Sequence, residues 1–321
     1  MPGRALVIGG GLAGLTAAGR LRDAGRDVVV VDKGRRPGGR ANTREHDMHR
    51  FDHGAQFFTV RDPRVTPLLH DWLHTGLVAP WEGRLVRIEG DTINPAKPAP
   101  RYVGVPGMID LALALAAALN VRTGIRIEQL NRSEDGWWAT DSEGQVRGPF
   151  GEVVVAVPAP QAAPLLTDAP GLQAVVASVD MAPCWAAMLV FDRPVPLGFD
   201  GAFVSDGPIS WIAKNASKPR RPGAEAWVLH ATPDWTRRHW ETDRTHIPAL
   251  LMKEMEDRWG PMPGLDFGRA HRWGYALATG APTGALYDPE LRLGVCGDWC
   301  AGGRVEGAIV SGIEVSDFFG C

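Results

Sequence analysis

The stretch that decides the fold is Ala5-Leu6-Val7-Ile8-Gly9-Gly10-Gly11-Leu12-Ala13-Gly14, which predicts a short apolar strand, a glycine turn and the start of a helix. A helical pattern continues over residues 15–24 and ends at Gly25. Residues 28–31 are four valines in a row, which is typical of a strand buried in a parallel sheet. The sequence therefore predicts a βαβ unit at its beginning.

The spacing Gly9-x-Gly11-x-x-Gly14 is that of a dinucleotide-binding turn. The first glycine allows the tight turn, the second lets the backbone approach a pyrophosphate, and the third lets the helix pack closely on the sheet. The helix N-terminus offers N–H groups and a positive dipole end to the phosphates. Asp32 ends the second strand, where an acid hydrogen-bonds the ribose hydroxyls of an adenosine and disfavours a 2′-phosphate.

Two further glycine clusters separate FAD from NAD as the ligand. Residues 33–40 (K-G-R-R-P-G-G-R) resemble the Gly-Gly-Arg element of amine-oxidase-type flavoproteins. Residues 297–308 (G-D-W-C-A-G-G-R-V-E-G-A) resemble a second FAD fingerprint of the same superfamily. The resemblance implies that Arg40 lies along the pyrophosphate and flavin, and that Asp298 binds the ribityl chain or pyrophosphate. The N–H groups near Val305 are then expected to face the flavin N1/C2 carbonyl.

The resemblance extends to residues 51–57, which correspond to a segment that reaches the flavin face, and to Ile127, whose backbone corresponds to an adenine contact. We therefore predict non-covalently bound FAD. The predicted cofactor-binding residues are Gly9, Gly11, Leu12, Ala13, Gly14, Asp32, Lys33, Gly39, Arg40, Gly54, Ala55, Gln56, Phe57, Ile127, Gly297, Asp298, Arg304, Val305, Glu306 and Gly307.

Composition excludes several other classes of protein. The formal net charge of −3 gives no indication of nucleic acid or an anionic membrane as a partner. No apolar run reaches the roughly 18 residues that a membrane span needs, and the first residues lack the pattern of a secretory signal. Four cysteines are too few for a disulfide scaffold, and no metal-ligand spacing is present. We therefore expect a cytoplasmic protein with free thiols and no metal.

The sequence also resembles the bacterial branch of the renalase family. The segments that carry this resemblance are residues 38–40, 52–62, 157–161, 211–219, 229–232, 271–273 and 295–307. The resemblance implies hydride transfer from 2- and 6-dihydro isomers of NAD or NADP to flavin N5. Reoxidation by O2 then gives the normal oxidised nucleotide and hydrogen peroxide, which amounts to metabolite repair.

A dihydronicotinamide ring has to lie flat on the flavin, which suits an aromatic pocket with a few polar groups. Seven of the twelve tryptophans lie between residues 180 and 280. We predict that Asn215 and His230 hold the carboxamide and that Trp211 and Trp227 are walls of the pocket. A plain core role for each tryptophan and a structural role for His230 stay open.

The main alternative is a flavin-dependent oxidase of a small amine. Such enzymes often hold a lysine near flavin N5 through water, and among the five lysines Lys214 is the best candidate. Residues 180–280 contain no acidic cluster to attract an amine. A non-catalytic binding protein on the same fold is a further alternative, which the three intact glycine clusters disfavour. For Cys296 and Cys300 we expect ordinary packing rather than a covalent flavin or a redox dithiol.

These observations predict an α/β fold of two domains, because the 321 residues exceed the size at which one hydrophobic core usually stops growing. A Rossmann-like FAD-binding domain is expected from residues 1–58, 100–160 and 282–321. A substrate domain with a mixed sheet is expected from residues 59–99 and 161–281. The active site is then expected at their interface.

Overall fold

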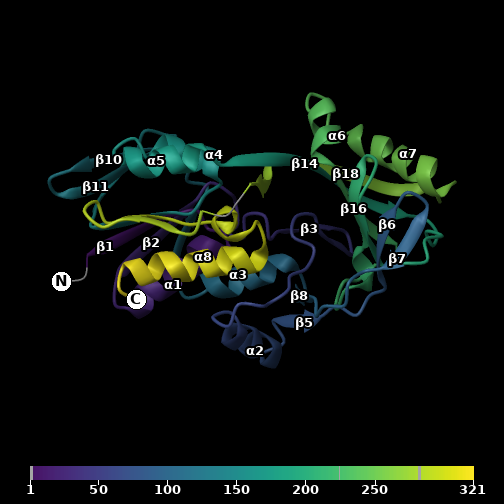
Figure 1. Ribbon diagram of the computed structural model, residues 1–321, viewed down its shortest axis with the longest axis horizontal. Coiled ribbons are helices and arrows are strands. Elements are labelled where there is room, and N and C mark those ends of the chain that lie inside the picture. The colour runs from purple at the N-terminus through teal and green to yellow at the C-terminus, as the bar shows by residue number, and fades with distance from the viewer. Residues whose placement is uncertain (1–2, 224, 281–282) are drawn as a thin grey trace.

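The computed structural model describes residues 3–223, 225–280 and 283–321, and this part of the chain forms two units, each built on a large sheet (Figure 1). The first sheet has six strands, and every neighbouring pair is parallel except the edge pair β19–β20. Across the sheet the strands are β19 (Leu286–Asp288), β20 (Leu293–Val295), β13 (Glu152–Val155), β1 (Arg4–Ile8), β2 (Asp27–Asp32) and β9 (Asn120–Thr123).

Alternate residues of these strands point into two apolar layers, because successive side chains of a strand face opposite sides of the sheet. Val7 and Val30 pack in the layer formed with α1 (Leu12–Asp23), α3 (Met108–Ala116) and α8 (Val305–Phe318). Leu6 and Val29 pack in the opposite layer. That layer is covered by the small sheet of β10 (Ile127–Ser133), β11 (Gly136–Asp141) and β12 (Val146–Phe150), and by α4 (Ala159–Ala162), η1 (Ala163–Leu165) and α5 (Pro170–Ala177).

The second sheet has seven strands and lies at the other end of the molecule (Figure 1). The long strand β14 extends from the first unit into this sheet, where it pairs with β17 and with the edge strand β18. Across the sheet the strands are β18 (Leu265–Thr279), β14 (Asp180–Phe191), β17 (Ala226–Ala231), β16 (Ile209–Lys214), β15 (Gly201–Val204), β6 (Leu85–Glu89) and β7 (Thr92–Pro95).

The two faces of the seven-stranded sheet have different neighbours. One face carries α6 (Pro233–Arg238) and α7 (Ile247–Trp259), so that Trp227 and Leu229 pack with Leu251. The other face is turned toward the first unit. There Val228 packs with Phe51, and Trp211 belongs to the same apolar cluster as the helices of the six-stranded sheet.

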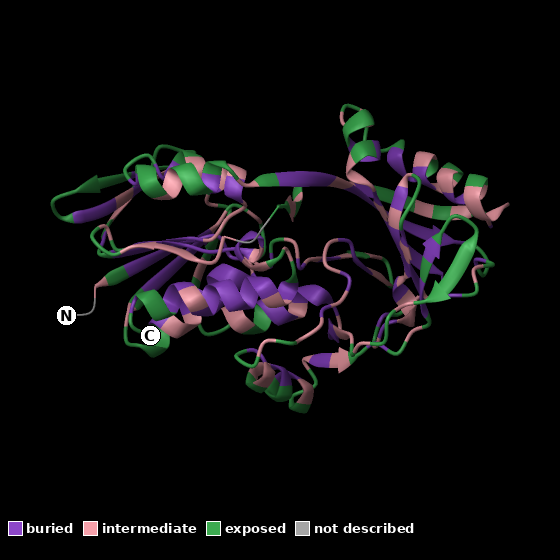
Figure 2. Ribbon diagram, viewed as in Figure 1, coloured by how far each residue is buried: buried purple, intermediate pink, exposed green. Residues whose placement is uncertain are grey.

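Shorter elements lie outside the two large sheets. They are the hairpin β3 (Thr43–His46) and β4 (His49–Asp52), α2 (Thr66–His74), the pair β5 (Val78–Pro80) and β8 (Tyr102–Gly104), and the short helices η2 (Asn215–Ser217) and η3 (Asp298–Ala301). Figure 2 shows that buried residues concentrate in the sheets and in α1 and α8, whereas β7 is exposed.

The predicted fold class is confirmed: the chain is α/β, with a Rossmann-like sheet and a second, mixed sheet. One detail differs from expectation: residues 161–177, which the sequence assigns to the substrate domain, pack on the six-stranded sheet. The predicted domain limits otherwise stay predictions, and the limit at 281/282 lies outside the described residues. Among the described residues, none of the helices combines the length and the hydropathy that crossing a bilayer requires.

Candidate functional site

The glycine turn between β1 and α1 has little room on one side and open space on the other. Gly9 has φ of +116°, and a Cβ there would lie 2.5 Å from the carbonyl oxygen of Ala156. A Cβ on Gly14 would collide with the carbonyl of Gly9. A Cβ on Gly11, by contrast, would meet nothing within 4 Å. Because Gly11 caps α1 without a side-chain hydrogen bond, the first N–H groups of α1, at Leu12 and Ala13, are left for a ligand.

Asp32 ends β2 and ties two loops together. Its Oδ2 accepts the N–H of Gly10 at 2.6 Å, and its Oδ1 accepts the N–H of Gly34 at 2.6 Å. The neighbouring Lys33 points to Gln161, whose Oε1 accepts from Nζ at 3.0 Å. The Asp32 carboxylate is half-buried. Its two hydrogen bonds hold it at the turn where the sequence predicts the adenosine ribose.

The second glycine cluster folds onto the first. The N–H of Gly38 donates to the carbonyl of Gly10 at 2.8 Å. Gly39 has φ of +54°, and a Cβ there would lie 3.5 Å from the Cα of Gly11. Both loops therefore border the open space beside Gly11.

The third cluster joins them through an ion pair. Arg40 Nη2 lies 2.5 Å from Asp298 Oδ1, and its Nη1 donates to the carbonyl of Ala276 at 3.3 Å. The carbonyl of Arg40 accepts the N–H of Ala55 at 3.0 Å, and a Cβ on Gly54 would collide with that same carbonyl. The structure thus brings together three predicted segments at Arg40, although Arg40 and Asp298 lie 258 positions apart in the chain.

The start of α8 is the second helix N-terminus at this place. Its N-cap, Arg304, makes no side-chain capping hydrogen bond, so the N–H groups at Val305 are available to a ligand. Two other residues of this cluster have structural contacts. Glu306 accepts from the backbone N–H groups of Arg61 and Asp62, and a Cβ on Gly307 would collide with η3.

Ile127 and Gly297 are placed by packing. The Ile127 side chain is buried under the six-stranded sheet, while the N–H of Ile125 donates to the carbonyl of Asp32 at 2.9 Å. A Cβ on Gly297 would collide with the indole of Trp299. Cys296 and Cys300 are free and buried, and burial raises the pKa of the Cys300 thiol to about 12, so that it stays protonated.

An aromatic cluster lies beyond Gly54, on the face of the seven-stranded sheet that is turned toward the first unit. The ring centroids of Phe203 and Trp211 are 4.7 Å apart, those of Phe57 and Trp211 are 5.6 Å apart, and those of Phe57 and Trp81 are 6.0 Å apart. The Nε1 of Trp211 is buried and has no hydrogen-bond partner among the described residues. An unpaired buried donor costs free energy, so it points to a ligand that accepts from it.

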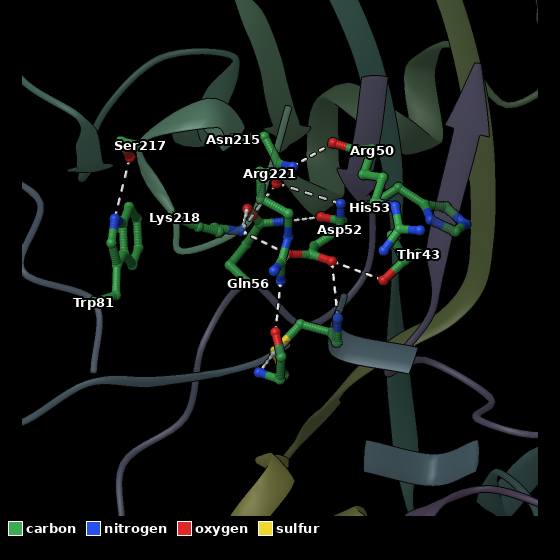
Figure 3. A network of polar contacts seen from close by, with 12 residues as sticks. Thr43, Arg50, Asp52, His53, Gln56, Trp81, Asn215, Ser217, Lys218 and Arg221 are labelled. Atoms are coloured by element: carbon green, nitrogen blue, oxygen red, sulfur yellow. Dashed lines mark hydrogen bonds and ion pairs between the residues drawn. The ribbon is translucent and has the colours of Figure 1, made fainter. Parts of the chain in front are cut away.

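A fully buried ionic network adjoins this cluster (Figure 3). Asp52 Oδ2 lies 2.8 Å from Arg221 Nη2 and 3.2 Å from Lys218 Nζ. The same Nζ donates to Gln56 Oε1 and to Asn215 Oδ1, each at 3.1 Å. Two cations thus share one carboxylate, and the network carries an excess positive charge.

The ionisation of this network follows from its burial and its charges. Burial opposes the charged form of Asp52, but Lys218, Arg221, the N–H of Met108 and the hydroxyl of Thr43 outweigh it and lower the Asp52 pKa to about 2. Burial lowers the pKa of Lys218 to about 8, although Asp52 raises it. Both groups are therefore charged near neutral pH.

Three histidines and a tryptophan form the next side of the site. The carbonyl of His53 accepts from Trp273 Nε1 at 2.9 Å and lies 3.2 Å from His230 Nε2. His53 stacks on Trp273, with 5.1 Å between centroids, and meets His271 edge-on at 5.1 Å. Burial lowers the pKa of His53 to about 3 and those of His230 and His271 to about 4, so all three are neutral near pH 7.

Three sequence expectations need correction. Trp227 is not a pocket wall, because β17 turns it to the helix-covered face, where its Nε1 donates to Glu225 Oε2 at 3.1 Å. Asn215 is fully buried, and its amide bonds to the Arg50 carbonyl, the Asp52 N–H and Lys218 rather than facing open space. Lys214 pairs with Glu225 at 2.6 Å, so Lys218 is the lysine beside Gln56.

Sequence reasoning missed several residues of this site. The sequence assigns no role to Asp52 and His53, which lie in the segment 51–57, and it does not indicate Lys218 or Arg221 as site residues. The signal was the basic run Lys218-Pro219-Arg220-Arg221 directly after Asn215. No sequence pattern connects this run with Asp52, which lies 166 to 169 positions away.

The fold and the three glycine loops define a class, that of two-unit dinucleotide-binding proteins. FAD fits these loops: two uncapped helix N-termini face ligand space, and a Cβ on Gly11 would find nothing within 4 Å. A family model described as "Flavin containing amine oxidoreductase" matches residues 87–317, and one described as "NAD(P)-binding Rossmann-like domain" matches residues 7–72. The chain belongs to the flavin-containing amine oxidoreductase family, and its cofactor is FAD.

Known proteins resemble the chain in two ways. It is 53% identical over 60 residues to phytoene desaturase (neurosporene-forming) of Rhodobacter capsulatus, a match that covers 19% of this chain and 12% of the desaturase. Cyclohexylamine oxidase from Brevibacterium oxydans has a similar fold, with a TM-score of 0.78 and 12% identity over 99% of this chain and 98% of that one. A cofactor-binding variant of putrescine oxidase matches with a TM-score of 0.75 and 13% identity over 100% of this chain and 99% of that one.

Proposed function

We propose that the protein oxidises 2- or 6-dihydro isomers of NAD(P)H, with O2 as the final electron acceptor. The overall reaction converts the dihydro form, O2 and one proton into NAD(P)+ and H2O2. The observation that carries the proposal is the excess positive charge buried beside the aromatic cluster. Bound FAD supplies the hydride acceptor, and the resemblance of the sequence to renalases motivates the choice of substrate.

The aromatic cluster is suited to a planar ring. Phe57, Trp81 and Trp211 exclude water and offer flat apolar surfaces, and the free Nε1 of Trp211 is a donor for a carboxamide oxygen. Hydride removal from a dihydropyridine needs orientation rather than a base, because no proton has to leave the ring carbon. The neutral histidines agree with this requirement.

The charge of the site favours such a substrate over an amine. Lys218 Nζ lies 5.3 Å above the ring of Trp81, and Asp52 is already shared with Arg221. A second cation in this low-dielectric region is repelled, so a substrate ammonium is disfavoured. A neutral dihydropyridine attached to phosphates meets no such penalty.

Amine oxidation is the second candidate. It is favoured by the family and by one observation, the buried Lys218 beside Gln56. Such an enzyme would act on an uncharged amine, since the pKa of Lys218, lowered to about 8 by burial, leaves it protonated near neutral pH. For either reaction we propose a cytoplasmic location, where the reducing environment keeps cysteines such as these as free thiols.

Anaerobic stopped-flow spectroscopy of the FAD-bound protein tests the proposal. Flavin bleaching is followed with the 2-, 4- and 6-dihydro forms of NAD and NADP and with simple primary amines. We expect fast bleaching by a 2- or 6-dihydro form, and one H2O2 per turnover once O2 is admitted. Bleaching by the ordinary 4-dihydro form alone would indicate a general reductase, and bleaching by amines alone would establish the second candidate.

A further inference from the structure

A pocket of about 440 Å³ lies along the edge strand β18, next to the site described above. Four arginines from three chain segments line it: Arg44 on β3, Arg244 in the loop before α7, and Arg269 and Arg272 on β18. The other lining residues are Trp185, Thr242, Asp243, Ala270 and His271. The pocket is therefore strongly basic.

Among the described residues, these arginines have no carboxylate partner. Within residues 3–223, 225–280 and 283–321, none of the four forms an ion pair, although most arginines elsewhere in the protein do. The single acid of the pocket, Asp243, accepts hydrogen bonds from the N–H and hydroxyl of Thr245. Burial and the charges of Arg269, Arg35, Arg244 and Arg36 lower the pKa of Arg44. The guanidinium groups of such a cluster repel one another, and a bound anion would reduce this repulsion.

The pocket shares a wall with the aromatic and histidine side of the site. Arg44 Nε lies 3.4 Å from His53 Nε2, and Arg44 Nη2 lies 3.3 Å from His271 Nδ1. His53 immediately precedes Gly54, and a Cβ on Gly54 would lie 3.3 Å from the Trp273 ring. A molecule bound beside Gly54 is therefore separated from Arg44 only by the side chains of His53, His271 and Trp273.

We propose that this arginine pocket binds the phosphate groups of a dinucleotide substrate while its nicotinamide end lies in the aromatic cluster. Guanidinium groups suit this task, because their planar pairs of donors match phosphate oxygens. The edge position of β18 also leaves backbone N–H groups free of sheet pairing on that side. The identity of the substrate rests on the proposed function, but the phosphate site is testable without it.

The first test measures binding of ADP-ribose, which carries the pyrophosphate but no nicotinamide, to the FAD-bound protein by calorimetry. Arg244→Gln and Arg269→Gln change exposed side chains, so both variants are expected to fold. Each is expected to weaken ADP-ribose binding about tenfold, and added salt is expected to weaken wild-type binding. The matched control is Arg132→Gln on β10, an exposed arginine of the other unit, which should bind like the wild type.

The second test separates the phosphate site from the reaction. Flavin reduction is compared for a dihydronicotinamide dinucleotide and for the corresponding riboside, which has no phosphate. The two pocket variants should raise the dinucleotide concentration for half-maximal reduction about tenfold and leave the riboside value unchanged.

Unaltered ADP-ribose binding in both variants, or an equal loss in Arg132→Gln, would overturn the phosphate site. An equal effect of the pocket variants on riboside and dinucleotide would also overturn it. If no dihydronicotinamide reduces the flavin but ADP-ribose binding falls as expected, the proposed reaction fails and the phosphate site is supported.

Discussion

The two faces of the seven-stranded sheet are built from alternate residues of the same strands, but one forms an apolar core and the other lines the candidate site. Trp227 and Leu229 face α7 and belong to an apolar core. Trp211 and His230, on the neighbouring strands β16 and β17, face the first unit, beside a buried ion network and an unpaired donor. The helix-covered face is satisfied by its own contacts, whereas the other face holds charge and hydrogen-bonding capacity that only a ligand would use.

This difference shows that burial alone does not identify a functional tryptophan. Trp211 and Trp227 are both buried, at 6% and 1% exposure. Their indole N–H groups distinguish them, because Trp227 donates to Glu225 and Trp211 donates to no described residue. Three predictions test the contrast between the faces, in order of decreasing effect.

The largest effect is expected for Asp52→Asn at the end of β4, which packs against the face turned toward the first unit. The change leaves Lys218 and Arg221 buried without their counter-charge, which costs about 3–5 kcal/mol of the free energy of unfolding. Urea denaturation of the FAD-bound protein at pH 7 measures it. The control is Asp257→Asn, which breaks the exposed Lys253–Asp257 pair of α7 and should change the free energy of unfolding little, because water screens this pair. Similar losses for the two variants would contradict the assignment of a critical charge to the buried network.

The second prediction concerns acid. Burial lowers the pKa of His53 from 6.5 to about 3, so between these values the unfolded chain binds a proton that the folded protein does not. The stability that depends on neutral His53 is complete above pH 6.5 and is lost as the pH falls toward 3. At pH 5 the loss is about 2 kcal/mol. Unfolding of His53→Gln, compared at pH 7 and pH 5, should show a correspondingly smaller decline than the wild type, and parallel declines would refute this.

The smallest effects compare the two tryptophans directly. Trp227→Phe removes the donor to buried Glu225 and should cost about 1–2 kcal/mol of stability while leaving the KM of the folded enzyme unchanged. Trp211→Phe removes a donor without a described protein partner, so it should cost less stability than Trp227→Phe. It should, however, raise KM about three- to tenfold if that donor binds substrate. Steady-state kinetics and denaturation of both variants decide the matter, and a KM change in Trp227→Phe would break the contrast.

The cofactor side was predictable from sequence because it depends on the backbone. Gly9 and Gly14 occupy positions where a Cβ would collide with a carbonyl. Only glycine fits there, so the spacing of the glycines identifies the turn from the sequence. The same holds for Asp32, which is the last residue of its strand. These local rules extend to the fold class, because alternating apolar strands and helices imply a parallel sheet.

The substrate side was less predictable because it depends on register and on distant partners. A shift in pairing between Ile209 and Trp211 helps decide which way Trp211 faces, and sequence alternation alone does not reveal such a shift. Likewise, the contact between Lys218 and Asp52 depends on the packing of the β3–β4 hairpin against β17. The corrections at Trp227, Asn215 and Lys214 all arise from this dependence on tertiary packing.

The contact between α1 and α8 has a consequence for synthesis. A Cβ on Gly312 would lie 2.5 Å from the carbonyl of Ala13, and Arg20 pairs with Asp317, 297 positions later. The layer that covers the first glycine turn is therefore completed only when residues near 317 have left the ribosome. Until then the apolar side of α1 lacks the cover that α8 provides in the folded protein.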